Sequence, residues 1–175
     1  MDWQAAQTWF AGKRMTFAWL ALAALIVVLD IWTKGLASDS LNLYRPHEVT
    51  PWLNLTLAHN YGAAFSFLSS AGGWQRWFFT VLASAVTLVL IVWLLRLPAA
   101  DRLTGLALSL VIGGAIGNLI DRIQNGYVVD FIDVYYRDAH WPAFNLADSA
   151  ITCGVILLLV SGLLLSKKSG PGGEG

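Results

Sequence analysis

The sequence predicts an all-α polytopic membrane protein: four transmembrane helices with a small extracytoplasmic β-containing subdomain between the first two. Of its 175 residues, 57% are hydrophobic and only 13% are charged, whereas a soluble domain carries about twice that charged fraction. The mean hydropathy is +0.59. Four apolar runs also approach the length of about 20 residues that a helix needs to cross the hydrocarbon core of a bilayer.

The four predicted spans cover about residues 15–33, 77–95, 103–120 and 144–166, and basic residues flank them. Residues 1–168 are predicted to form one four-span domain, and the glycine-rich residues 169–175 are predicted to be a disordered tail.

Charge at the span ends predicts that both termini lie in the cytoplasm. Six basic residues fall on the side of the termini: Lys13, Arg14, Arg96, Arg102, Lys167 and Lys168. Five fall on the other side: Lys34, Arg45, Arg76, Arg122 and Arg137. The six lie in short segments at span ends, where the positive-inside rule applies best. A cleaved signal peptide is the alternative for the first span, because Gly35-Leu36-Ala37 resembles a processing site, although the apolar segment is long for that role.

Acidic residues gather on the extracytoplasmic side of this predicted topology. Eight of the eleven lie there: Asp30, Asp39, Glu48, Asp121, Asp130, Asp133, Asp138 and Asp148. Ionisable groups at membrane depth are costly and usually functional. For Asp148 alone a structural explanation is equally good, because Asn145 and Asp148 have the spacing of a capping box at a helix start.

The long connection between the first two spans has a strand pattern. Leu53, Leu55 and Leu57 alternate with polar or small residues, which predicts a half-buried strand within a subdomain of about residues 38–62. Asn60-Tyr61-Gly62 is a turn signal at its end. Four aromatic residues are predicted to lie at the membrane interfaces: Trp74, Trp77, Trp141 and Tyr135.

Short-range spacing predicts several structural contacts. Gly113, Gly114 and Gly117 form a pattern of small residues that favours close helix packing. Asp30 and Lys34 are four residues apart and are expected to pair, and Asn118 and Asp121 share one face of the third span. Asp121 and the adjacent Arg122 are interpreted as a charge pair at a helix end.

Several chemistries lack the residues they require. Eleven basic and eleven acidic residues balance, so no nucleic-acid partner is expected. The histidines (His47, His59 and His140) are far apart and have no cysteine partner, so no metal site is expected. Cys153 is the single cysteine, no serine has an evident His–Asp set, and no cofactor is expected.

Asp130 and Asp148 remain as candidates for catalysis. Asp130 follows the apolar Val128-Val129, and Asp148 stands at a predicted helix start. Two carboxylates held close in a low-dielectric site share one proton, so the pair supplies an acid and a base together near neutral pH. Such a pair hydrolyses a peptide bond with water alone, and the sequence assigns the proton to neither residue.

Five stretches of the chain, in order, resemble the lipoprotein signal peptidase (signal peptidase II) family. They are Asp30-Ile-Trp-Thr-Lys34, Asn60-Tyr-Gly-Ala-Ala-Phe65, Gly117-Asn-Leu-Ile-Asp-Arg122, Val128-Val-Asp-Phe131 and Phe144-Asn-Leu-Ala-Asp148. The resemblance implies a four-helix aspartic endopeptidase of the bacterial inner membrane. Such an enzyme removes the signal peptide of a prolipoprotein immediately before a diacylglyceryl-modified cysteine. Ile31 stands where many members carry glutamine.

The resemblance also implies roles for single residues. Asp130 and Asp148 match the catalytic pair. Seven residues match positions that bind substrate or support the site: Asp30, Asn60, Gly62, Asn118, Asp121, Arg122 and Asn145. The implied partners are prolipoprotein signal peptides and membrane lipids, and the protein is expected to be monomeric. The stretch Leu53–Ala58 is hypothesised to hold the cleaved segment by edge pairing.

Two other classes of function remain as alternatives. Intramembrane carboxylates also relay protons or bind cations in small transporters, although this chain has no internal repeat and its acids lie at one surface rather than at the midplane. The second alternative is a structural membrane protein without chemistry. Only a peptidase releases a peptide product.

Overall fold

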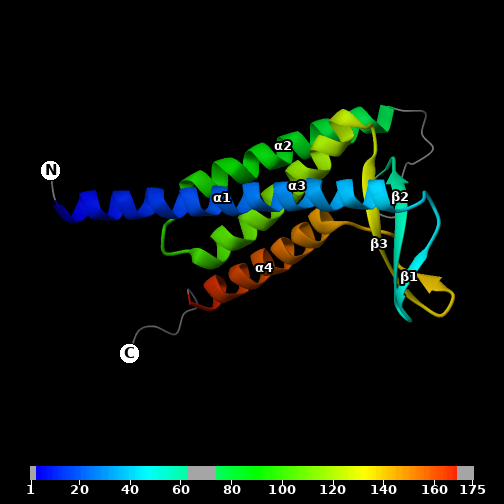
Figure 1. Cartoon of the computed structure of the whole chain (residues 1–175). Coiled ribbons are helices and arrows are strands. Elements are labelled where there is room, and N and C mark those ends of the chain that lie inside the picture. The colour runs from blue at the N-terminus through cyan, green and yellow to red at the C-terminus, as the bar shows by residue number, and fades with distance from the viewer. Residues whose placement is uncertain (1–2, 63–73, 169–175) are drawn as a thin grey trace.

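The computed structural model describes residues 3–62 and 74–168, and it confirms four helices and a small sheet (Figure 1). The helices are α1 (Trp3–Ser40), α2 (Trp74–Arg96), α3 (Arg102–Gln124) and α4 (Leu146–Lys168). Each contains a segment long and apolar enough to cross a membrane. The sheet lies at one end of the helical bundle, and the start of α1 and the end of α4 lie toward the other end.

The helices differ from the predicted spans at their ends. α1 continues through Ser40, past the predicted end at residue 33, so the first residues of the predicted 38–62 subdomain are helical. α4 begins at Leu146, and Asn145 stands immediately before it. Apolar runs predict the part of a helix that lies in hydrocarbon, whereas a helix continues beyond it wherever its polar residues find partners.

The sheet has four antiparallel strands in the order β1-β2-β3-β4. They are β1 (His47–Thr50), β2 (Leu53–Asn60), β3 (Val128–Tyr136) and β4 (Ala139–His140). β2 is the predicted strand. β3 and β4 come from the connection between α3 and α4, so the prediction that the subdomain lies only between the first two helices was incomplete. The first three residues of β3 are all buried, which removes the alternation by which β2 was found.

β2 is an internal strand, and this contradicts edge pairing by residues Leu53–Ala58. β1 pairs with its first half and β3 with most of its length. Beyond β1, the backbone N–H of Tyr44 donates to the carbonyl of Leu57 at 2.8 Å. Most of the stretch therefore has strand or backbone partners on both sides, and a substrate cannot add to it there.

α3 is the central helix, and small residues let its neighbours approach. It contacts α1, α2 and α4. A Cβ at Gly113 would lie 2.8 Å from the carbonyl oxygen of Ala23 in α1, and a Cβ at Gly114 would collide with the backbone of Ala147 in α4. These contacts confirm that the glycines serve close helix packing. The outward faces of α1, α2 and α4 expose leucine, valine and aromatic side chains, as expected of helices surrounded by lipid.

Candidate active site

The first turn of α4 places Asp148 by a capping box. The backbone N–H of Asp148 donates to Asn145 Oδ1 at 2.9 Å, and the backbone N–H of Asn145 donates to Asp148 Oδ2 at 3.3 Å. This confirms the predicted cap. The backbone N–H of Ala147 donates to Asp30 Oδ1 at 2.9 Å, so α1 also holds the start of α4. A helix start leaves its first N–H groups without partners inside the helix. Here the N–H groups of Asn145, Ala147 and Asp148 all donate to side-chain oxygens.

Asp130 lies on β3 and is only 2% exposed. Its two carboxylate oxygens accept from two side-chain amides: Asn145 Nδ2 at 2.8 Å and Asn60 Nδ2 at 3.1 Å. Asn60 ends β2, and its own Oδ1 accepts from the backbone N–H of Gly62 at 3.1 Å. The predicted turn thus orients Asn60 toward Asp130.

Asn118 of α3 joins the other groups. Its Nδ2 donates to Asp148 Oδ1 at 2.7 Å. Its Oδ1 accepts from Asn145 Nδ2 at 3.2 Å and from Lys34 Nζ at 2.9 Å. Asn118 and Asn145 therefore connect α1, α3, β3 and α4 in one buried hydrogen-bond network, in which every side-chain amide has partners.

A buried lysine sits between two carboxylates beneath this network. Lys34 Nζ lies 2.7 Å from Asp30 Oδ2 and 3.0 Å from Asp121 Oδ2. Asp121 Oδ2 also accepts from the backbone N–H of Val129 at 3.0 Å, which fixes the chain just before Asp130. The expected pairing of Asp30 with Lys34 is confirmed.

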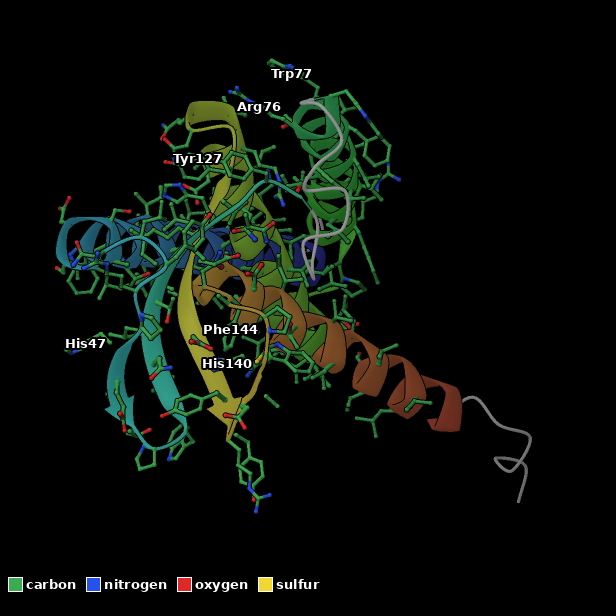
Figure 2. All side chains as sticks on the ribbon, turned by 90° about the vertical axis from the view of Figure 1, so that its right-hand side faces the viewer. His47, Arg76, Trp77, Tyr127, His140 and Phe144 are labelled. Carbon is green, nitrogen blue, oxygen red and sulfur yellow. The ribbon has the colours of Figure 1, made fainter. Side chains whose placement is uncertain are left out.

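The interpretation of Asp121 and Arg122 as a charge pair was wrong. Adjacent residues on a helix do not face each other, and Asp121 turns to Lys34 of α1 instead. Arg122 Nη2 donates to the carbonyl of Gly62 at 3.3 Å, so it bridges the end of α3 to the turn after β2. Arg76 of α2 donates to the carbonyls of Arg122 and Ile123 at 2.9 and 2.7 Å and thereby caps α3 (Figure 2).

A cavity of about 1000 Å³ opens beside the two aspartates. Its polar lining includes Asp130, Asp148, Asn60, Asn118 and Arg122. The remaining lining is mainly apolar and includes Tyr44, Trp141, Phe144 and Ile151. Figure 2, seen from the sheet end, shows Phe144 beside the first turn of α4. The cavity therefore presents carboxylates at one wall and an apolar surface suited to a lipid-like or hydrophobic ligand at another.

Burial makes Asp130 a much weaker acid than an ordinary aspartate. Burial, and after it the negative charge of Asp148, raise the pKa of Asp130 to about 7, although hydrogen bonds from Asn60 and Asn145 and the charge of Lys34 act in the opposite direction. A carboxyl with that pKa holds or releases its proton near neutral pH. This is the property required of a group that acts as acid in one step and as base in the next.

The structure divides the eight acids that were predicted to be extracytoplasmic into groups. It brings together Asp30, Asp121, Asp130 and Asp148. Asp133 lies apart and accepts from His140, Asn54 and Thr56 at 2.8 to 3.3 Å. Asp39, Glu48 and Asp138 are exposed. All seven residues predicted to bind substrate or support the site contact the network or line the cavity.

Sequence reasoning left three parts of the site out: a lysine, one wall of the cavity and a histidine. Lys34 was expected only as a partner of Asp30, yet it bonds three side chains. Its place four residues after Asp30 was the signal that could have included it. The wall formed by Trp141–Phe144 was also missed, because nothing in those residues indicates that β3 pairs with Phe144. His59 also lines the cavity, stacked on Tyr127 at 3.9 Å, and burial lowers its pKa.

Known proteins resemble the chain over nearly its whole length. A model of the signal peptidase (SPase) II family matches residues 22–164. A lipoprotein signal peptidase of Acinetobacter baumannii is 59% identical over 150 residues, which are 86% of this chain and 85% of the relative. One from Vibrio cholerae is 48% identical over 163 residues, which are 92% and 95% of the two chains.

A solved structure described as a bacterial membrane enzyme has a TM-score of 0.78 and 32% identity, over 90% of this chain and 93% of that one. A second, under the same description, has a TM-score of 0.73 and 33% identity, over 83% and 92%. Fold, sequence and family model thus agree. The chain belongs to the signal peptidase II family, the aspartic-type peptidases of the bacterial inner membrane that process prolipoproteins.

Proposed function

We propose that Asp130 and Asp148 are the catalytic pair, and that the enzyme cuts diacylglyceryl-modified prolipoproteins immediately before the lipidated cysteine. The observation that carries the proposal is that Asn145 bonds both aspartates. One side chain caps α4 at Asp148 and donates to Asp130, so both carboxylates are held at the same cavity by a residue that lies between them. No other described carboxylates lie together on the cavity wall.

The chemistry requires only the pair and one water. The ionised member of the pair takes a proton from water as the water oxygen attacks the scissile carbonyl carbon. The protonated member hydrogen-bonds to the carbonyl oxygen and stabilises the charge that develops there. Arg122, Asn60 and Asn118 line the same cavity, and the amides of Asn60 and Asn118 keep the pair in place by hydrogen bonds.

The position of the site suits a substrate that stays in the membrane. The network lies where the helices meet the sheet (Figure 1), and the apolar part of the cavity continues along α4 through Ile151 and Cys153. A signal peptide is helical in lipid and must become extended for its peptide bond to be attacked. We propose that membrane lipid surrounds the substrate at this cavity and that one monomer is sufficient.

A cleavage assay tests this function. The purified protein is mixed with a diacylglyceryl-modified precursor, and the same precursor without lipid serves as the control. We expect a signal peptide that ends at the residue before the modified cysteine, with much slower cleavage of the control. A transporter or a structural protein releases no peptide, so absence of product from a well-folded sample would refute the proposal.

Orientation is a separate proposal: both termini are cytoplasmic, and the site lies near the extracytoplasmic surface. We replace Cys153 with serine, and then introduce Ser40→Cys at the end of α1 or Ala99→Cys between α2 and α3. In intact cells, an impermeant thiol reagent should label position 40 and should reach position 99 only after permeabilisation. Protection at 40 together with labelling at 99 would reverse the orientation.

A further inference from the structure

The three side-chain amides around the aspartates have fixed orientations. Asn145 Oδ1 accepts from a backbone N–H, and so does Asn60 Oδ1. Asn118 Oδ1 accepts from the ammonium of Lys34 at 2.9 Å. A backbone N–H and an ammonium can only donate, so none of these amides can flip. Each Nδ2 therefore points at a carboxylate, and all four carboxylate oxygens of the pair accept hydrogen bonds.

The two carboxylates nevertheless have different environments. Asp130 lies on a strand and accepts from two amides, those of Asn60 and Asn145. Asp148 lies in the first turn of α4, where the helix dipole favours negative charge. It also accepts from the amide of Asn118, whose oxygen is bound to a cation. A hydrogen bond to a charged group polarises the next bond in the chain and strengthens it.

The other charges nearby do not reproduce this difference. Arg122 of α3 faces both members of the pair and acts on both. Asp30 of α1 and Asp121 of α3 oppose Lys34 and neutralise part of its charge. Among the described residues, Asn118 is the one side chain that bonds both a cation and a member of the pair. Lys34 Nζ donates to its Oδ1 at 2.9 Å, and its Nδ2 donates to Asp148 Oδ1 at 2.7 Å.

We propose that Lys34, acting through Asn118, is a positioning residue that keeps Asp148 ionised, so that Asp130 holds the proton of the pair. This assignment rests on the proposed function. It makes Asp148 the group that activates water and Asp130 the group that protonates the carbonyl oxygen. The raised pKa of Asp130, about 7, agrees with it.

The proton transfers balance under this assignment. Asp148 takes a proton from water as the water oxygen bonds to the carbonyl carbon, and Asp130 gives its proton to the carbonyl oxygen. The product of this step is a gem-diol. Asp148 then gives its proton to the nitrogen as the C–N bond breaks, and Asp130 recovers a proton from one hydroxyl. A carboxylic acid and an amine leave, and the pair returns to its first state.

The test is the pH profile of kcat/KM for Lys34→Gln, normalised to folded protein. Loss of the cation should move the acidic limb, where the base becomes protonated, to higher pH by about one unit, or about tenfold in rate on that limb. The alkaline limb, where Asp130 loses its proton, should move in the same direction but less. The charge of Lys34 also lowers the pKa of Asp130, but no single amide bonds both of them. Lys34→Arg keeps the charge and should keep the acidic limb. A purely structural role lowers the whole profile and leaves both limbs in place.

Asp121→Asn is a second variant, for which we expect the acidic limb to move in the opposite direction. It removes a carboxylate that neutralises Lys34, so the acidic limb should move to lower pH. This variant decides the question if Lys34→Gln does not fold. Unmoved acidic limbs in an active, folded variant would overturn the role of Lys34. An inactive wild type would instead overturn the proposed function, so the two failures are distinguishable.

Discussion

Asp130→Asn and Asp148→Asn are each expected to reduce cleavage by about three orders of magnitude, while the protein stays folded and inserted. Asparagine keeps the shape of the side chain but can neither take a proton from water nor carry the proton of the pair. Because the two residues act as one unit, the double variant should be scarcely slower than either single variant. The measurement is turnover of a lipidated precursor by the two single variants and the double variant.

Asp138→Asn is the matched control, because this carboxylate lies in the same connection between α3 and α4 as Asp130 and is exposed. It should cleave at the wild-type rate. Losses that add in the double variant would show two separate roles, and they would contradict a catalytic pair.

Asp30→Asn and Asp121→Asn are expected to lower stability more than turnover. Asp30 is 0% exposed and Asp121 7% exposed, and each loses its ion pair with Lys34 when it becomes asparagine. Breaking a buried pair by removing one partner destabilises a protein by about 3 kcal/mol or more. Because Lys34 keeps its second carboxylate, we place each loss near the lower end of that range.

The readouts are the thermal unfolding midpoint of each purified variant and its cleavage rate per folded molecule. The midpoint should fall clearly below that of Asp138→Asn, and the rate should stay within about tenfold of the wild type, which corresponds to about 1.4 kcal/mol. If Asp121→Asn is as stable as the control yet as inactive as Asp130→Asn, the catalytic pair is wrongly assigned.

The sequence predicted the elements whose pattern is local. Long apolar runs identify four helices, alternation identifies β2, and the spacing of Asn145 and Asp148 identifies the cap. β3 was missed because its first residues are buried on both faces and lie against helices as well as strands. A strand that is buried on both faces is apolar throughout, so its sequence lacks the alternation of apolar and polar residues that identifies a strand.

The family resemblance named single residues that the structure places in the network or on the cavity wall, but the sequence did not predict their contacts. Lys34 and Asn118 are 84 residues apart, and Asn60 and Asp130 are 70 apart. Local helix geometry excludes a pairing of Asp121 with its neighbour Arg122, but it does not decide that Asp121 turns to α1. That choice follows from the close approach of α1 and α3, where a Cβ at Gly117 would collide with Asp30.

Under the proposed catalytic assignment, the order of synthesis along the chain determines when the peptidase becomes able to cut. The donors and counter-charges come from α1, from the connection between α1 and α2, and from α3, but Asn145 and Asp148 follow all of these in the chain, at the start of α4. A ribosome-bound chain that has inserted three helices has Asp130 without its partner and without Asn145. Hydrolytic competence therefore arrives with the last helix, so incompletely synthesised molecules carry no working proteolytic centre into a membrane full of precursor proteins.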